Sequence, residues 1–210
     1  MPDDVIAPDQ VDATELRAVI GQPIPEIAEK EMPALDQHCR HFISLSPFLC
    51  IGTSGTDGGQ DVSPRGDPPG FVYVIDDKTL LIPERPGNRR ADTMSNILEN
   101  PNVGIVFFLP GVEETLRVNG RATVVRDAER LAEMVVNGKA PKLGIRIDIG
   151  QVFFHCAKAL KRSKLWHPDT PIKRSAFPSY GQIVRDQRRP DDAVADIEAQ
   201  IEKNYREELY

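Results

Sequence analysis

The most chemically distinctive stretch of the sequence is 83–90, which reads Pro-Glu-Arg-Pro-Gly-Asn-Arg-Arg. It follows an apolar segment typical of a strand and enters a predicted helix at Asn88, a residue type that favours helix N-caps. A helix N-terminus carries unpaired N–H groups and partial positive charge, so Arg89 and Arg90 suit it only if an anion binds there. Arginine can bind two phosphate oxygens at once. The stretch indicates a phosphate site, and solvated surface arginines are the alternative that its spacing leaves open.

A second cluster places four basic residues beside the single tryptophan. Residues 158–166 follow a predicted strand and include Lys158, Ser163 and Trp166. An amphipathic aromatic ring next to cations could cover a planar ligand. From composition alone, a basic surface turn beside a buried tryptophan is the favoured interpretation.

The third cluster is Ser-Pro-Arg-Gly-Asp-Pro-Pro-Gly at 63–70, where Gly66 would let the backbone approach a ligand closely beside Arg65. The alternative is a rigid connecting loop that holds an Arg–Asp pair.

No metal site is expected. His38, Cys39 and His41 lie near one another in the sequence, as do His155 and Cys156, but neither group has the spacing of a closed zinc site. No serine or cysteine stands out as a nucleophile, so we assign no catalytic residue.

The charge of the chain is unevenly distributed. The 210 residues carry a net charge of −6, and residues 191–210 hold seven acids and two bases. The body is therefore close to neutral, which argues against broad nucleic-acid binding but leaves room for a local anion site. Three cysteines, no secretory signal in the acidic Met1–Asp12 segment and no apolar run long enough for a membrane helix predict a soluble cytoplasmic protein.

The periodicity predicts a mainly β protein with helices, of α+β class. Short strands separated by tight turns favour an antiparallel sheet that closes into a small barrel. The predicted strands are 48–53, 61–64, 71–75, 79–82, 103–109, 115–125 and 146–155. The predicted helices are 14–20, one that starts near Pro33, 89–99, 127–136 and an acidic amphipathic helix after 190.

Together, in this order, the three clusters resemble the pyridoxamine 5′-phosphate oxidase-like family of FMN-binding split-barrel flavoproteins, and the uncharacterised branch most of all. The stretches that carry the resemblance are 61–72, 80–124 and 153–166, about a third of the chain. The middle stretch is the most specific, because it joins the arginine-rich turn to the strands that follow it.

The resemblance implies a six-stranded antiparallel split barrel that forms a homodimer with two FMN sites at the interface. On the family pattern, Asn88, Arg89 and Arg90 would bind the FMN phosphate. The other implied cofactor residues are Arg65, Gly66, Ile82 and Pro83 along the flavin, and Lys158, Ser163 and Trp166 from the partner subunit. The founding oxidase has an Arg-x-His element after its tryptophan, whereas Trp166 is followed here by His-Pro-Asp, so vitamin B6 oxidation is not expected.

The expected function is an FMN-dependent oxidoreductase that acts on a small molecule, with NADH or NADPH as a candidate electron donor. The alternatives are a flavin carrier or sensor without turnover, and a related split barrel that uses haem or a deazaflavin. We expect an N-terminal helical extension at 1–45, the FMN-binding barrel at 46–167, and a linker with the acidic helix at 168–210.

Overall fold

The structure is a computed structural model, and it describes residues 11–210. The absence of a secretory signal expected for Met1–Asp12 therefore falls almost entirely outside the described residues. The chain divides into two compact units, Met1–Glu31 and Met32–Tyr210. In the first unit, the described residues form helices α1 (Ala13–Ile20) and α2 (Pro25–Ala28). The three-part division of the chain expected from the sequence stays a prediction.

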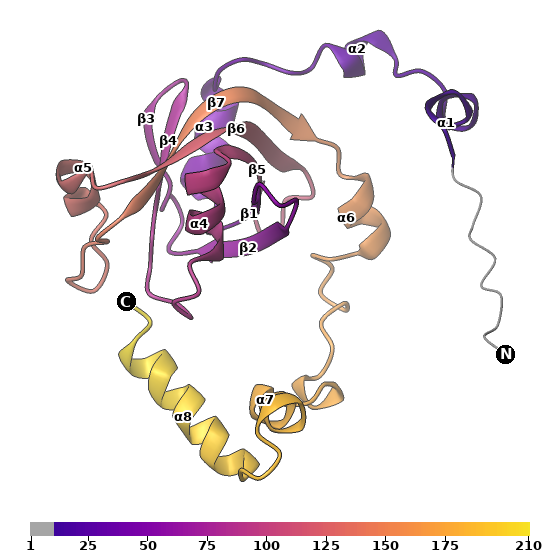
Figure 1. Cartoon of the computed structure of the whole chain (residues 1–210). Coiled ribbons are helices and arrows are strands. Elements are labelled where there is room, and N and C mark those ends of the chain that lie inside the picture. Colours follow the sequence, from indigo (N-terminus) through magenta and orange to yellow (C-terminus); the bar gives the residue numbers. More distant parts are fainter. Residues whose placement is uncertain (1–10) are drawn as a thin grey trace, which may run out of the picture. The chain divides into compact units, whose positions relative to one another are not determined.

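The second unit is built on one antiparallel sheet with the strand order β2-β1-β5-β6-β7-β4-β3 (Figure 1). Its strands are β1 (Phe48–Ser54), β2 (Gln60–Gly66), β3 (Tyr73–Asp76), β4 (Thr79–Pro83), β5 (Asn102–Phe108), β6 (Thr115–Val125) and β7 (Gly144–His155). The helices of this unit are α3 (Gln37–Leu45), α4 (Asp92–Glu99), α5 (Ala128–Glu133), α6 (Lys158–Ser163), α7 (Tyr180–Arg188) and α8 (Val194–Glu207), with a short 3-10 helix at Arg174–Ala176.

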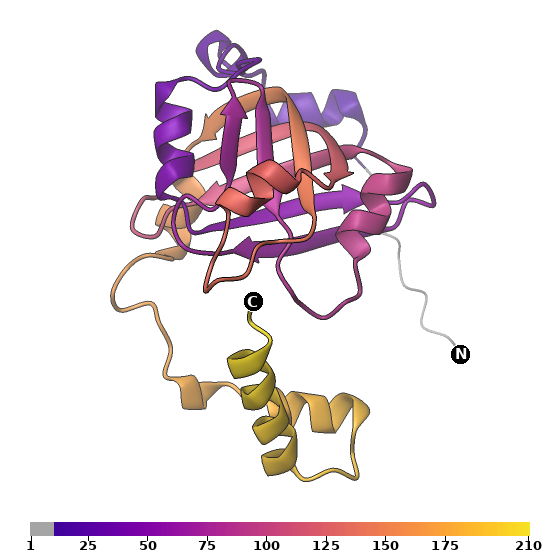
Figure 2. The ribbon, with the colours of Figure 1, turned by 90° about the vertical axis from the view of Figure 1, so that its left-hand side faces the viewer.

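The α+β class and the antiparallel sheet are confirmed, and each of the seven strands predicted from the periodicity is present, where the resemblance implied six. The edge strands β2 and β3 each pair with a single neighbour, β1 and β4 respectively. Pro64 sits within β2, where the missing N–H of proline is tolerated because the strand has a free edge. The curvature of the sheet is visible in Figure 2, which turns the view by 90°.

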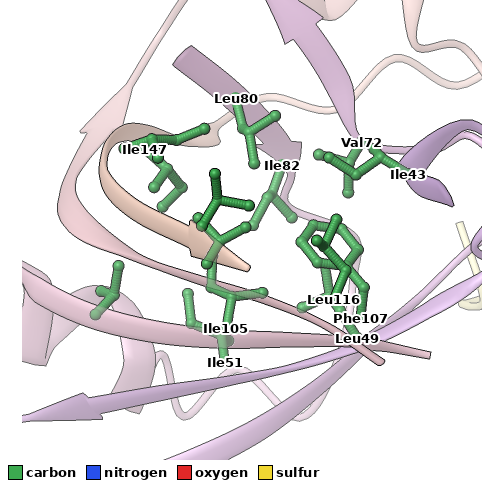
Figure 3. Packing of buried hydrophobic residues seen from close by; sticks show 14 of the residues in the cluster. Ile43, Leu49, Ile51, Val72, Leu80, Ile82, Ile105, Phe107, Leu116 and Ile147 are labelled. Atoms are coloured by element: carbon green, nitrogen blue, oxygen red, sulfur yellow. The ribbon is translucent and has the colours of Figure 1, made fainter. Parts of the chain in front are cut away.

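The core fills the concave side of the curved sheet. Alternate residues of the strands point inward, and side chains such as Ile51, Phe107 and Ile147 have no exposed surface (Figure 3). Helix α3 covers one opening of this core through Cys39, Phe42 and Ile43. Burial raises the pKa of the Cys39 thiol to about 11, so this cysteine is a packing residue and remains protonated at neutral pH.

Strand β4 is buried along its whole length. Leu80 and Ile82 belong to the core, whereas Leu81 points to the other face, where Leu131 of α5 is also buried. A strand covered on both faces reads as a continuous apolar run, which is why Thr79–Pro83 shows no alternation. The rigidity of β4 matters because the arginine-rich stretch starts where this strand ends.

Two predicted helices differ from the observed ones, α3 at its start and α5 mainly at its end. Helix α3 begins at Gln37 and not near Pro33, because the Asp36 carboxylate caps it by accepting a hydrogen bond from the Cys39 N–H at 2.8 Å. Helix α5 begins at Ala128 and ends at Glu133, with Asp127 as its cap.

Helices α7 and α8 pack against each other. Ile197 of α8 is buried, and a Cβ at Gly181 of α7 would lie 2.4 Å from the Cγ of Glu198, so the two helices cross closely at this glycine. The apolar face of this acidic amphipathic helix is only partly covered, since Tyr205 and Leu209 stay exposed. None of the helices within residues 11–210 is both long and apolar enough to cross a membrane.

Gly120 provides a test of the sheet geometry. The pairing of β6 with β7 shifts its register at this residue, and a Cβ placed there would lie 2.3 Å from the Asp148 carbonyl oxygen. Gly120→Ala should therefore lower the free energy of unfolding by about 1–3 kcal/mol, measured by urea denaturation. Gly150→Ala is the matched control, because its Cβ would lie 3.7 Å from the nearest atom, and equal losses in the two variants would contradict the register.

Candidate functional site

A cavity of about 880 Å³ lies where the ends of β2 and β4 meet the loop 84–91. Its volume is within the range of sites that hold cofactors and drug-sized ligands. Six of the residues singled out in the sequence line it: Arg65, Gly66, Pro83, Asn88, Arg89 and Arg90. The fold thus joins the first and third sequence clusters, which lie about 20 residues apart, in one cavity.

The arginine loop differs from the sequence prediction in one respect. Helix α4 begins at Asp92, so Arg89 and Arg90 precede the helix and do not form its first turn. Asn88 is not the N-cap: its side-chain oxygen accepts from the Arg90 N–H at 3.0 Å, a local turn that competes with helix geometry. Arg89 and Ala91 both have positive φ, 61° and 59°, which is uncommon for residues with a Cβ.

Both arginines are exposed and each meets a carboxylate. The side chain of Arg90 is 71% exposed, and its Nε donates to Asp92 Oδ2 at 2.7 Å. Arg89 is 84% exposed and lies 3.4 Å from Glu208 Oε2. Exposed ion pairs of this kind contribute little to stability and exchange easily, so an incoming anion can replace the carboxylates.

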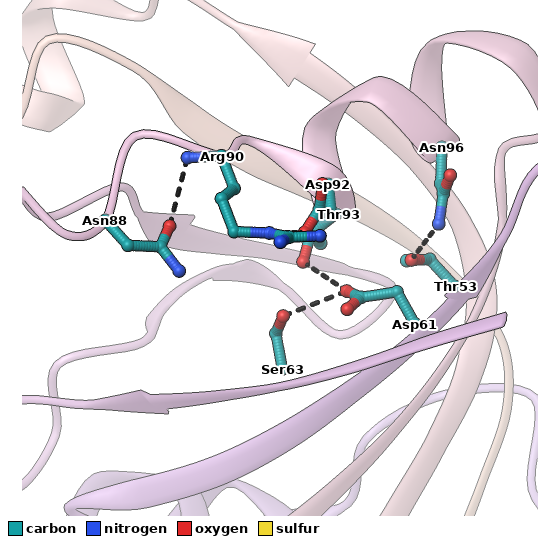
Figure 4. Close-up of polar contacts among 8 residues, drawn as sticks. All are labelled: Thr53, Asp61, Ser63, Asn88, Arg90, Asp92, Thr93 and Asn96. Carbon is teal, nitrogen blue, oxygen red and sulfur yellow. Dashed lines mark hydrogen bonds and ion pairs between the residues drawn. The ribbon is translucent and has the colours of Figure 1, made fainter. Parts of the chain in front are cut away.

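A polar network holds the start of α4 on the sheet (Figure 4). Asp61 of β2 accepts hydrogen bonds from Ser63 and Thr93, both at 2.9 Å, and Thr93 is buried in the first turn of α4. Further along the helix, the Asn96 side chain donates to Thr53 of β1 at 3.1 Å. The loop of arginines is therefore fixed at one end by β4 and at the other by this network.

Arg65 and Glu84 form an incomplete pair on the cavity wall. The Arg65 Nε lies 3.7 Å from Glu84 Oε2, too far for a hydrogen bond, and both atoms are buried without a hydrogen-bond partner in the described part of the chain. Burial raises the pKa of Glu84, and the positive charge of Arg65 opposes that rise. A buried donor and a buried acceptor that lack partners are costly unless a ligand completes them.

Asp67 and Arg85 are not among the predicted site residues, and the Arg–Asp pair considered from the sequence lay inside the 63–70 loop. The structure instead pairs Asp67 with Arg85, whose Nε donates to Asp67 Oδ2 at 2.6 Å. The Asp67 side chain is 1% exposed, and Arg85 also donates to the Met134 carbonyl oxygen at 2.7 Å. The available signal was position, because each residue lies within two residues of the end of a strand that leads into the cavity.

The remaining candidate residues lie outside this cavity. Ile82 is fully buried in the core beneath it. Lys158 and Ser163 belong to α6, and the Trp166 indole donates to the Val112 carbonyl oxygen at 2.9 Å. Their expected contribution from a partner subunit stays a prediction. Within residues 11–210, no three His, Cys, Asp or Glu side chains are grouped in a way that could hold a metal ion.

Glu84 gives the apoprotein a specific pH dependence. Because its pKa is raised in the folded state, the folded protein retains a proton that the unfolded chain has already lost. Stability should therefore fall as the pH rises from the ordinary glutamate pKa through the raised value, and Glu84→Gln should remove that component. Urea midpoints of the apoprotein across this range test it, with the exposed Glu129→Gln as control. Identical pH profiles for Glu84→Gln and the wild type would contradict the assignment.

Several solved structures resemble the chain at low sequence identity. HupZ of Group A Streptococcus is 18% identical, with 57% of this chain and 93% of that chain aligned and a TM-score of 0.49. A putative pyridoxamine 5′-phosphate oxidase of Lactobacillus delbrueckii is 20% identical, with 58% and 95% aligned and a TM-score of 0.46. An FMN-binding protein of Syntrophomonas wolfei is 15% identical, with 56% and 81% aligned and a TM-score of 0.43.

A comparison with curated proteins found no match. The sequence profile of the pyridoxamine 5′-phosphate oxidase family, however, matches residues 35–156, which is more than half of the chain. The matched region contains the whole sheet and the arginine loop, and it confirms the resemblance drawn from the three sequence clusters. The chain belongs to the pyridoxamine 5′-phosphate oxidase family.

Proposed function

We propose that the protein is an FMN-dependent oxidoreductase that acts on a small molecule. The observation that carries the proposal is the cavity itself, which combines two exchangeable arginines at one side with a buried donor and acceptor that lack partners. An FMN molecule has matching parts, namely a phosphate and a polar ring edge with both N–H and C=O groups. The three unpaired cysteines also suit the reducing compartment expected from the sequence.

The residues present fit the phosphate of FMN. A phosphomonoester carries about −1.5 to −2 charges at neutral pH. Arg89 and Arg90 would exchange Glu208 and Asp92 for phosphate oxygens, which offer more acceptor sites than one carboxylate. Asn88, which already shapes the turn around the Arg90 N–H, would hold this loop in place.

The residues also fit the ring. Arg65 Nε would donate to a flavin carbonyl oxygen, and Glu84 Oε2 would accept from a ring N–H, so each orphaned atom would gain a partner. The positive charge of Arg65 would favour the reduced, anionic form of the ring. FMN itself supplies the redox chemistry when bound, while the chain positions it and excludes water.

Helix α6 suggests where a second wall comes from. It has no buried residue, although it carries Lys158 and Ser163 and is followed by the exposed Leu165. A basic and partly apolar helix with no buried residue favours a homodimer in which Lys158, Ser163 and Trp166 complete the cavity of the partner subunit. The electron donor would be NADH or NADPH, and flavin that binds without turnover would favour a carrier or sensor instead.

The phosphate assignment is tested with Arg89→Ala/Arg90→Ala. Charge-assisted hydrogen bonds contribute on the order of 1.5–3 kcal/mol each, so the double variant should bind FMN roughly 10²–10⁴-fold more weakly, towards the lower value because both side chains are exposed. Riboflavin, which lacks the phosphate, should bind both proteins equally. Flavin fluorescence titrations measure all four affinities.

The matched control for that experiment is Arg146→Ala/Arg185→Ala. These arginines are also exposed and ion-paired to a nearby aspartate, but they lie outside the cavity. The control should bind FMN as the wild type does. If the cavity variant keeps its FMN affinity, or if it loses riboflavin to the same extent, the arginines do not bind the phosphate.

The dimer is tested by light scattering. We expect twice the mass of one chain for the wild type. Lys158→Glu/Arg162→Glu, which reverses two exposed charges one turn apart on α6, should weaken dimerisation and FMN binding together. A monomeric wild-type protein that still holds FMN would contradict the shared site.

A further inference from the structure

Tyr210 lines the candidate cavity and contacts residues from three loops around it. Its phenol donates a hydrogen bond to Asp67 Oδ1 at 2.8 Å, and the Arg85 guanidinium lies over its ring at 5.5 Å from the centroid. Lys139 donates to the Tyr210 backbone oxygen. Tyr210 is thus held by the connection after β2, the loop after β4 and the segment before β7, which lie far from it in the sequence.

The Asp67 carboxylate requires hydrogen-bond donors. The Asp67 side chain is almost fully buried, and its two oxygens accept from different groups, Oδ2 from Arg85 and Oδ1 from the phenol. Arg85 is itself fixed by the Met134 carbonyl oxygen. Without the phenol, Oδ1 would be a buried charged oxygen with no partner, which is strongly disfavoured.

The same short segment reaches the arginine loop. Glu208, two residues before Tyr210, lies 3.4 Å from Arg89, and both carboxylate and arginine are exposed there. Tyr210 and Lys139 line the same cavity as Arg65 and Arg90. Residues 208–210 therefore contact the cavity at two points, a buried one at Asp67 and an exposed one at Arg89.

These two contacts differ in how easily they exchange. An exposed ion pair is weak and gives way to a better anion, whereas a hydrogen bond to a buried carboxylate is kept. A phosphate that reaches Arg89 would displace Glu208 but would leave the Tyr210 phenol hydrogen-bonded to Asp67. The segment would then stay beside the bound ligand as a fixed wall.

We propose that residues 208–210 form a wall of the flavin cavity, with Tyr210 as the positioning residue that anchors it and Glu208 as the anion that phosphate replaces. The inference rests on the proposed function, since the ligand that the wall retains is FMN. In this role residues 208–210 slow the release of bound flavin and limit the access of small molecules to the flavin ring.

The anchor is tested first without flavin. Tyr210→Phe removes only the phenol oxygen and should lower the melting temperature of the apoprotein by about 2–8 °C, because Asp67 loses a donor. Tyr205→Phe is the matched control, since Tyr205 lies on the exposed side of α8, and it should leave the melting temperature unchanged. An unchanged melting temperature in Tyr210→Phe would overturn the anchor.

The wall is tested with bound FMN, because a measurement of stability alone does not report how well the wall retains flavin. Tyr210→Ala should release FMN at least about tenfold faster and expose its fluorescence to iodide quenching, and Tyr210→Phe, which keeps the ring, should show a smaller effect on both. Glu208→Gln should instead tighten FMN binding severalfold, because it removes the competing carboxylate, while Glu207→Gln should not.

The outcomes separate the inference from the proposed function. If the wild type binds FMN but Tyr210→Ala releases it at the wild-type rate with unchanged iodide quenching, the wall is wrong and the flavin site stands. If the wild type binds no FMN, the proposed function is wrong and the inference falls with it. Weaker FMN binding in Glu208→Gln would overturn the role assigned to that carboxylate.

Discussion

The candidate site depends on one buried charge, the carboxylate of Asp67. A carboxylate with 1% of its side chain exposed is tolerated only if it is paired and hydrogen-bonded. Arg85 and Tyr210 meet that requirement, and in doing so they tie the end of β2, the loop after β4 and the segment 208–210 to one point. Removing one partner of such a pair typically costs about 3–5 kcal/mol, a large share of the stability of a single domain.

The arrangement of the cavity depends on how the two ends of the arginine loop are held. Arg85 is held at the start of the arginine loop, just after the buried strand β4, and the Asp61 network holds the loop at the start of α4. Between the two fixed ends, Arg89 and Ala91 adopt backbone conformations that cost free energy for residues with a Cβ. The two arginines reach solvent at the cavity, where only weak ion pairs occupy them.

Most strands and several residues of the candidate site could be predicted from the sequence, because their signals lie in neighbouring residues. The strand 115–125 was predicted with its observed ends because its pattern and flanking turns are strong, and Arg89 and Arg90 were selected because their types and positions suit an anion. Arg65 was selected through the family resemblance, and it lines the same cavity. The start of α4 was missed because Asn88 makes a local turn with Arg90, and a single sequence does not distinguish that turn from a helix cap.

The long-range contacts could not be predicted, since they depend on the packing of the whole barrel. Asp67 and Arg85 are 18 residues apart, and Tyr210 is 143 residues from Asp67, so no local pattern connects them. Glu84 likewise looked like an ordinary turn residue until the fold placed it beside Arg65 in a buried position.

We propose that the cavity between β2, β4 and the arginine loop binds FMN through its phosphate. A crystal structure of the protein grown with FMN tests this proposal without any variant. We expect phosphate oxygens within hydrogen-bond distance of both Arg89 and Arg90, with the flavin ring beside Arg65 and Glu84. A flavin bound elsewhere, or a phosphate that contacts neither arginine, would contradict it.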